Sequence, residues 1–111
     1  MSREDKELRK MIKETIKKVL RQYDVKPLKI ILFGSRARGN YKGDSDWDCF
    51  VIVEEELDRG KKREMIARIR IELARLKIPN DIIIQSSATF KKRKNDVGYL
   101  SYYVLKEGVE I

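Results

Sequence analysis

The spacing of apolar residues along the chain predicts two long helices. Across residues 6–23 apolar side chains recur every three or four positions, which places them on one face of a helix with 3.6 residues per turn. The same spacing appears across residues 61–77, and Pro79 lies just beyond it as a stop signal. Both segments are therefore expected to be amphipathic and to bury one face against a core.

Three shorter apolar runs have the length and the β-branched content of strands. They cover residues 28–33, 47–53 and 81–85, and the first lies between Pro27 and Gly34. The third run, "DIIIQ", is almost continuously apolar, so we expect a strand that is buried on both faces. Residues 35–45 are rich in Gly, Asn, Ser and Asp and indicate a helical turn followed by a loop.

A last helix is expected near the C-terminus, with Asn95 or Asp96 as its N-cap and Gly108 in a left-handed C-terminal cap. Helical geometry puts three aliphatic residues on one face and three tyrosines on the other: Val97, Leu100 and Val104, against Tyr99, Tyr102 and Tyr103. The tyrosines fit either an exposed protein interface or a cover for the edge of the core.

The order of these elements predicts an α/β (α+β) fold, with a small three-stranded mixed sheet flanked by about four helices. The connection between the first two strands is long enough for either strand direction. The length of 111 residues suits one domain, residues 1–111, because domains commonly run to about 100 to 150 residues.

The charge balance is consistent with two interpretations. The chain is 40% charged, carries a formal charge of +8 and has a pI near 9.6. A net positive field attracts nucleotides, nucleic acids or acidic protein surfaces. A surface of ion-pair networks, typical of heat-adapted proteins, has the same composition. We expect the basic run Lys91 to Lys94 to be a solvated loop, because no aromatic stacking platform accompanies it for nucleic acid.

Several function classes are excluded by composition. No apolar run reaches the roughly 18 residues of a bilayer span, and the N-terminal segment alternates charged with apolar residues, so we expect a cytoplasmic protein with no membrane contact. Cys49 is the only cysteine and there is no histidine, which excludes an internal disulfide, the usual zinc sites and His-based triads. A metal bound here would be a hard ion with oxygen ligands.

Asp46 and Asp48 open the second predicted strand. Residues two apart in a strand point to the same face, roughly 6.5 Å apart along the chain, so these carboxylates project together while Trp47 points away. Two neighbouring carboxylates repel each other, and Mg²⁺ relieves that repulsion while leaving coordination positions for phosphate and water. The alternative is an acidic loop whose aspartates cap turns.

A candidate phosphate site precedes these carboxylates. Gly34 follows the first predicted strand directly, and Ser35 begins the helical turn, so free backbone N–H groups and a hydroxyl lie where a strand meets a helix N-terminus. Glycine permits close approach of the backbone to a ligand, and Arg36 and Arg38 add positive charge. Either arginine could equally point to solvent, and "GS" alone is also found in ordinary turns.

The run "LFGSRARG", followed by "SDWD" at the start of an apolar strand, resembles the signature of the minimal nucleotidyltransferases of the DNA polymerase beta-like superfamily. That pattern is G-S-x-A-x-G, a short loop, then S-D-x-D, and it is matched by Gly34, Ser35, Ala37, Gly39, Ser45, Asp46 and Asp48. The family's third carboxylate, at the start of a later strand, corresponds to Asp81 in "NDIII", although Asn80 is more polar than usual there. Asp81 alone also suits a helix-to-strand turn.

The resemblance covers nearly the whole chain and implies a nucleotidyltransferase fold and an Mg²⁺-dependent enzyme. Such an enzyme would transfer a nucleotidyl group to a hydroxyl. The expected substrate is ATP, and the transferred group is AMP. The implied catalytic and metal-binding residues, which would hold two Mg²⁺ ions, are Asp46, Asp48 and Asp81. The implied nucleotide-binding residues are Gly34, Ser35, Arg36 and Arg38.

The same resemblance implies a partner. Minimal nucleotidyltransferases commonly pair with an all-helical HEPN-domain protein as antitoxin and toxin, and can transfer AMP to a tyrosine of the toxin. We therefore expect the antitoxin of such a pair, in a hetero-oligomer. Two alternatives stay open: a nucleotide-binding antitoxin that acts by stoichiometric binding without catalysis, and a small basic protein that binds nucleic acid.

Overall fold

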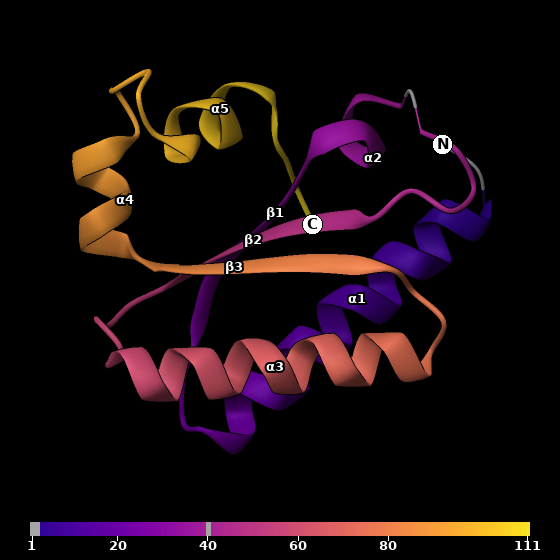
Figure 1. Ribbon diagram of the computed structural model, residues 1–111, viewed down its shortest axis with the longest axis horizontal. Helices are drawn as coiled ribbons and strands as arrows, with labels where there is room; N and C mark the ends of the chain where they lie inside the picture. The colour runs from indigo at the N-terminus through magenta and orange to yellow at the C-terminus, as the bar shows by residue number, and fades with distance from the viewer. Residues whose placement is uncertain (1–2, 40) are drawn as a thin grey trace.

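A mixed sheet of four strands with helices on both faces makes up the described part of the chain, residues 3–39 and 41–111 of this computed structural model (Figure 1). The helices are α1 (Arg3–Gln22), α2 (Gly34–Arg38), α3 (Arg59–Arg75), α4 (Ser87–Arg93) and α5 (Leu100–Glu107). The strands are β1 (Pro27–Phe33), β2 (Trp47–Val53), β3 (Asn80–Ser86) and β4 (Val109–Glu110). Their order across the sheet is β3-β2-β1-β4, with β2 parallel to β3 and with β1 antiparallel to both β2 and β4.

The main core lies between the sheet and the two long helices, which cover the same face and cross each other in the view of Figure 1. The helices bury the apolar stripes of their sequences: Ile12, Ile16, Val19 and Leu20 from α1, and Met65, Ile69 and Leu73 from α3. Burying an aliphatic side chain of this size contributes about 1.5–3 kcal/mol. Alternate residues of β2, from Trp47 to Val53, point into this core. The residues between them, Asp48 included, therefore face the other side of the sheet.

The opposite face carries α4 and α5 and a smaller apolar cluster (Figure 1). The cluster consists of Ile31, Phe50, Ile52, Phe90 and Val104. The ring centroid of Phe50 lies 5.8 Å from that of Phe90 and 6.4 Å from that of Phe33. Asp48 precedes Phe50 by two positions on the same face, so it lies where this cluster ends.

The predicted long helices and the three predicted strands are confirmed. The predicted strand 47–53 has the bounds of β2, and the other bounds differ from the prediction by at most three residues. The helical turn expected after the first strand is α2. The α/β class and the mixed sheet are also confirmed, although the described residues form four strands and five helices rather than three and about four.

The C-terminal third differs most from the sequence prediction. Lys91, Lys92 and Arg93 form the last turn of α4 instead of a loop. Ser86 caps that helix by accepting a hydrogen bond from the backbone N–H of Thr89 at 3.1 Å, and basic residues at a helix C-terminus interact favourably with the helix dipole.

The last helix begins later than predicted, at Leu100 rather than after Asn95 or Asp96. Val97 and Leu100, which were predicted on the aliphatic face with Val104, are consequently exposed over 62% and 42% of their surface. Val104 is buried as expected, and Tyr99 and Tyr103 are exposed. The tyrosines are therefore not simply a cover for the core.

Two further expectations are corrected by packing. Gly108 has φ −75° and ψ 159°, which is extended and not left-handed. A glycine is needed there because a Cβ atom would lie 2.4 Å from Ile31 Cγ2 and 2.4 Å from the Val104 carbonyl oxygen. β3 is an edge strand, so Ile82 and Ile84 are buried while Ile83 between them is only partly buried.

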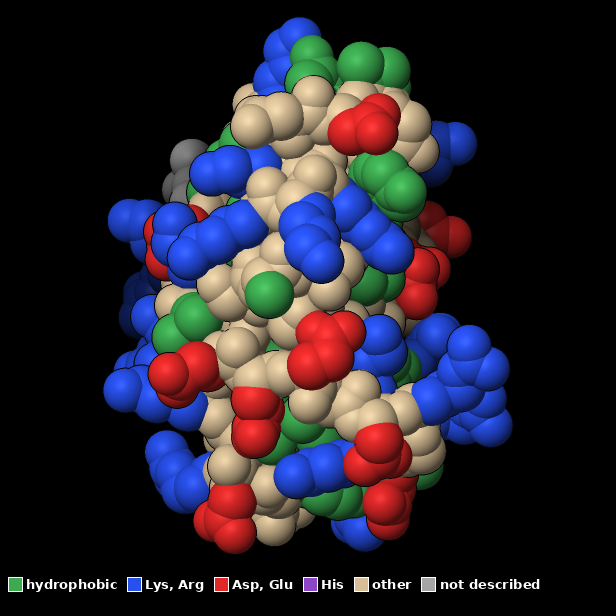
Figure 2. All heavy atoms as spheres, turned by 90° about the vertical axis from the view of Figure 1, so that its left-hand side faces the viewer, with side chains coloured by type: hydrophobic (Ala, Val, Ile, Leu, Met, Phe, Trp, Pro, Cys, Tyr) green, Lys and Arg blue, Asp and Glu red, His purple; other side chains and the backbone are tan. Residues whose placement is uncertain are grey.

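The surface over α4 and the start of α3 combines both signs of charge. Figure 2 shows Lys and Arg side chains gathered above Asp and Glu side chains on this face. The basic residues of α4 are therefore bordered by acidic neighbours rather than belonging to a face of one sign. Within the described ranges no helix combines the length and hydropathy needed to cross a bilayer.

Candidate active site

The pairing of β2 with β3 brings two of the predicted carboxylates together. In the parallel register Asp48 is the partner of Asp81, one pair after Trp47 and Asn80. Register partners in neighbouring strands have their side chains on the same face of the sheet, and both carboxylates are partly exposed. Asp46 is exposed and immediately precedes β2. The start of this strand pair thus carries all three predicted metal ligands.

Electrostatics show that the three carboxylates interact. The pKa of Asp48 is raised above its ordinary value, first by partial burial and then by repulsion from Asp81 and Asp46. The positive charge of Arg38 opposes this shift and lowers the pKa of Asp48. A cation bound between the carboxylates would relieve the same repulsion.

The turn between β1 and α2 lies directly against Asp48. Gly34 has φ +74°, a left-handed conformation that side-chain-bearing residues rarely adopt. A Cβ atom on Gly34 would lie 2.2 Å from Asp48 Oδ2, so any side chain here would displace the carboxylate. Phe33, just before this turn, is the register partner of Asp48 in β1. Glycine is thus required both by conformation and by the closeness of the predicted metal ligand.

Arg36, one of the predicted nucleotide-binding residues, is buried and holds the loop that leads to Asp46. Its guanidinium donates hydrogen bonds to the Ser45 carbonyl oxygen, at 3.2 Å from Nε and 3.1 Å from Nη2, and to the Gly43 carbonyl oxygen at 3.1 Å. The same group lies 4.2 Å from the ring centroid of Tyr41 and 4.5 Å from that of Trp47. These contacts hold Arg36 against the loop, whereas Arg38, the other predicted arginine, is exposed.

The loop is also attached to the first helix. The Tyr41 hydroxyl donates a hydrogen bond to the Asp5 carboxylate of α1, and this bond raises the pKa of Tyr41. Ser45 Oγ accepts a hydrogen bond from the backbone N–H of Lys42 at 2.9 Å. The position of Asp46 is therefore set by contacts at both ends of the loop.

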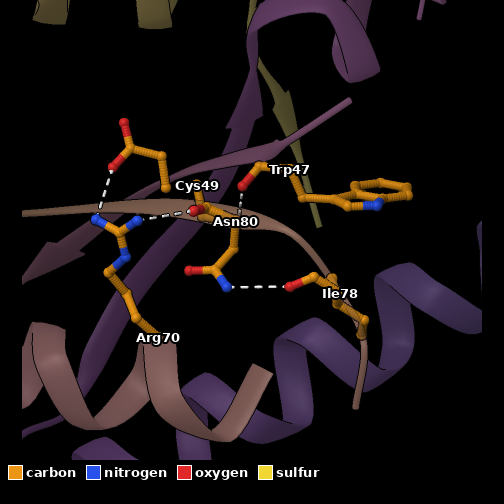
Figure 3. A network of polar contacts seen from close by, with 6 residues as sticks. Trp47, Cys49, Arg70, Ile78 and Asn80 are labelled. Atoms are coloured by element: carbon orange, nitrogen blue, oxygen red, sulfur yellow. Dashed lines mark hydrogen bonds and ion pairs between the residues drawn. The ribbon is translucent and has the colours of Figure 1, made fainter. Parts of the chain in front are cut away.

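Asp81 has a basic partner that sequence patterns did not identify. Arg70 of α3 places Nη1 3.5 Å from Asp81 Oδ1 and donates from Nη2 to the Asn80 carbonyl oxygen at 3.3 Å (Figure 3). The Asn80 side chain is buried and donates to the Ile78 carbonyl oxygen at 3.0 Å. In residues 3–39 and 41–111 no group of three or more His, Cys, Asp or Glu is arranged closely enough to hold a metal ion.

The residues present nevertheless fit a hard divalent cation in their chemistry. Carboxylate oxygens are the ligands that Mg²⁺ prefers, and Asp48 with Asp81 forms a register pair beside a glycine that leaves its carboxylate room. The carboxylates repel one another, as the raised pKa of Asp48 indicates. One of these carboxylates, that of Asp81, is also paired with the guanidinium of Arg70.

An open groove of about 640 Å³ adjoins Asp46. Asp46 and Arg70 line it together with Ile71, Ala74, Lys77, Ile78, Pro79 and Asn80. Its lining combines apolar residues with two cationic side chains, those of Arg70 and Lys77. A bound nucleotide or acceptor group would find both apolar and cationic contacts next to Asp46.

Comparison with known proteins identifies the family. Residues 14–111 match the family model described as Polymerase beta, Nucleotidyltransferase. The chain belongs to this nucleotidyltransferase family. The matched range includes Gly34 and the three carboxylates, so the resemblance read from the sequence motifs is confirmed at the level of the family. The chain has no match among curated proteins.

Solved structures share the nucleotidyltransferase fold. A crystal structure of a toxin–antitoxin with AMP-PNP contains a chain 23% identical, with a TM-score of 0.55, over 87% of this chain and 69% of that one. A chain of the toxin–antitoxin MntA-HepT is 20% identical, with a TM-score of 0.50, over 91% and 69%. At these identities the likeness establishes the fold alone.

Proposed function

We propose that this nucleotidyltransferase is Mg²⁺-dependent and transfers AMP from ATP to a hydroxyl of a protein partner. The observation that carries the proposal is the register of β2 and β3, which pairs Asp48 with Asp81 beside Gly34. Asp46 precedes the same strand and interacts electrostatically with Asp48. Carboxylates beside a glycine turn are the kind of groups that metal-dependent phosphoryl transfer needs, and this supports the proposal.

Each residue has a distinct part in this proposal. Asp46, Asp48 and Asp81 would hold two Mg²⁺ ions, which would supply charge neutralisation at the phosphates and would lower the pKa of the acceptor hydroxyl. Gly34 and Ser35 would place backbone N–H groups and a hydroxyl against the β- and γ-phosphates.

The reaction itself is an in-line displacement at the α-phosphorus. The acceptor oxygen forms a bond to that phosphorus, the bond to the bridging α–β oxygen breaks, and pyrophosphate leaves with the electron pair. The chain has no histidine that could take the proton of the acceptor hydroxyl, so a carboxylate would take it, and Asp81 is the one that we propose. Arg38, exposed near Asp48, would steady the triphosphate.

The proposed partner is a helical HEPN-domain protein, with this chain as the antitoxin. The sequence motifs resemble those of minimal nucleotidyltransferases, and similar solved structures are described as toxin–antitoxin assemblies, one of them with AMP-PNP. An exposed group of apolar and aromatic residues near α5 supports a hetero-oligomer: Val97, Tyr99, Leu100, Tyr103 and Leu105.

The proposed activity is tested with labelled ATP, Mg²⁺ and the protein encoded next to this one. The double variant Asp46→Asn, Asp48→Asn should lose at least about 100-fold in transfer rate, because its amides bind divalent cations far more weakly than carboxylates. Asp44→Asn, which neutralises an exposed loop carboxylate outside the strand pair, is the matched control and should retain activity. Equal labelling by the double variant and the wild type would refute the assignment.

A second candidate is an antitoxin that works by stoichiometric binding. The ion pair between Arg70 and Asp81 favours it, because that carboxylate already has a basic partner. The same double variant separates the two candidates in a neutralisation assay. If it neutralises the partner as well as the wild type while transferring no label, binding alone is sufficient.

A further inference from the structure

Arg70 connects helix α3 with the candidate active site, although it lies on an exposed helical position. Its guanidinium contacts two consecutive residues of β3, the Asp81 carboxylate at 3.5 Å and the Asn80 carbonyl oxygen at 3.3 Å (Figure 3). About half of each charged side chain is exposed, 53% for Arg70 and 51% for Asp81. An ion pair this exposed is weak and exchanges readily.

A second acceptor, the side-chain oxygen of Asn80, points toward the side on which Arg70 lies (Figure 3). Asn80 Oδ1 is buried and lacks a hydrogen-bond partner in the described part of the chain, while the amide nitrogen of that side chain is bonded to the Ile78 carbonyl oxygen. Buried acceptors of this kind are destabilising until they gain a donor. Arg70 already bonds the backbone carbonyl of Asn80, and a guanidinium has five N–H donors. Asn80 Oδ1 is thus an alternative partner for Arg70 when Asp81 is engaged elsewhere.

We propose that Arg70 is a positioning residue that competes with the divalent cation for Asp81 and transfers to Asn80 Oδ1 when the cation binds. The inference rests on the proposed function, since it assigns Asp81 to the cation site. A guanidinium and a divalent cation cannot both hold the same carboxylate oxygens at full strength, so the ion pair lowers the affinity for the cation. When the ion pair breaks, Asp81 is available to bind the cation together with Asp46 and Asp48.

Direct titration with Mn²⁺, in the absence of nucleotide, tests this competition. The concentration of unbound Mn²⁺ is read from its electron paramagnetic resonance signal. Arg70→Gln should bind Mn²⁺ about 3- to 5-fold more tightly than the wild type, the range expected for removing an exposed ion pair. Arg75→Gln makes the same charge change five residues further along α3, where the arginine pairs with Glu72 at 3.2 Å, and should leave the affinity unchanged.

A double-mutant cycle distinguishes competition at Asp81 from general charge repulsion. If Arg70 acts through Asp81, Arg70→Gln should have no effect on Mn²⁺ affinity in an Asp81→Asn background. If the arginine merely repels cations, the gain will be the same in both backgrounds, and the proposal is wrong. Thermal unfolding of each variant verifies that the fold is retained.

The outcomes for this inference and for the proposed function are separable. Wild-type binding of Mn²⁺ that disappears in the Asp46→Asn, Asp48→Asn variant supports the cation site itself. If that binding is present but Arg70→Gln binds no more tightly, only the role of Arg70 is refuted. If neither the wild type nor Arg70→Gln shows carboxylate-dependent binding, both the cation site and the competition are refuted.

Discussion

At the scale of single residues, the candidate site combines groups that sequence spacing predicts with one that it does not. The pair Asp46 and Asp48 follows from the two-residue period of a strand, whereas Asp81 was implied by the family resemblance. Arg70 could not be found this way, because its contact crosses from a helix to a neighbouring strand and depends on how the two pack. Its place on the exposed side of α3 gives no sequence signal that separates it from the other basic residues of that helix.

Asp48 should make the fold less stable at neutral pH. Its pKa is raised in the folded state by partial burial and by Asp81 and Asp46, so the folded protein binds the proton more readily than the unfolded chain. Protonated Asp48 therefore contributes favourably to stability at pH values below its ordinary pKa of 3.8. This contribution is lost as the pH rises through the pKa of Asp48 in the folded state. Asp48→Asn should raise the melting temperature at pH 7, measured with a chelator present.

The pH dependence of this gain is the decisive measurement. The difference between Asp48→Asn and the wild type should shrink as the pH falls toward 3, because the wild-type carboxyl is then protonated in both states. Asp44→Asn controls for the loss of one charge and should leave the melting temperature nearly unchanged at all pH values. A melting temperature for Asp48→Asn below that of wild type at pH 7 would show that the carboxylate is not strained by its neighbours. Such strain is expected where a site gives up stability for function.

At the scale of elements, the sequence predicted those with strong apolar periodicity and missed two short ones, α4 and β4. α4 was missed because its basic last turn has no apolar repeat, and its cap comes from Ser86 at the end of the preceding strand. β4 contains only Val109 and Glu110, too few for a period-two pattern. The loop before β2 was predicted as a loop, but its order comes from the buried Arg36 guanidinium, which sequence composition does not indicate.

Arg36 should contribute more to stability than its neighbour Arg38. Arg36→Gln removes hydrogen bonds to the Ser45 and Gly43 carbonyl oxygens and two contacts with aromatic rings, so the free energy of unfolding should fall by about 2 kcal/mol. Arg38→Gln, an exposed change on the same short helix, should alter it by less than about 0.5 kcal/mol. Urea denaturation followed by the fluorescence of Trp47, the only tryptophan, measures both.

Arg36→Lys separates charge from geometry at the same position. An ammonium group cannot reproduce the forked hydrogen bonds or the flat stacking of a guanidinium, so this variant should be nearly as unstable as Arg36→Gln. Recovery of wild-type stability by lysine would mean that charge alone orders the loop. The loop carries Ser45 and Asp46, so the same variants should also weaken Mn²⁺ binding.

At the scale of the whole molecule, the strand that bears the candidate ligands is also the centre of the core. β2 lies between β1 and β3, and its residues alternate between the main core and the face with the carboxylates. Cys49, next to Asp48, is fully buried, and burial with the nearby carboxylates raises its pKa to about 12. Its thiol is therefore both inaccessible and protonated at neutral pH. Exposure of the Cys49 thiol to solvent therefore reports unfolding of β2, the strand on which the proposed catalysis depends.

Ligand binding at the proposed site should protect Cys49 from a thiol reagent by mass action. When labelling requires unfolding, and when refolding is faster than labelling, the labelling rate is proportional to the fraction of unfolded protein. A ligand that binds only the folded protein lowers that fraction by a factor of 1 + [L]/Kd, so ATP with Mg²⁺ at about 100 times Kd should slow labelling about 100-fold.

ATP with a chelator, and the Asp46→Asn, Asp48→Asn variant with ATP and Mg²⁺, should show little protection. A Cys49→Ala, Glu14→Cys variant carries an exposed thiol on α1 instead, and its labelling should be fast and independent of ligand. Protection of Cys49 without any need for Mg²⁺ or for the two carboxylates would place nucleotide binding elsewhere on the molecule.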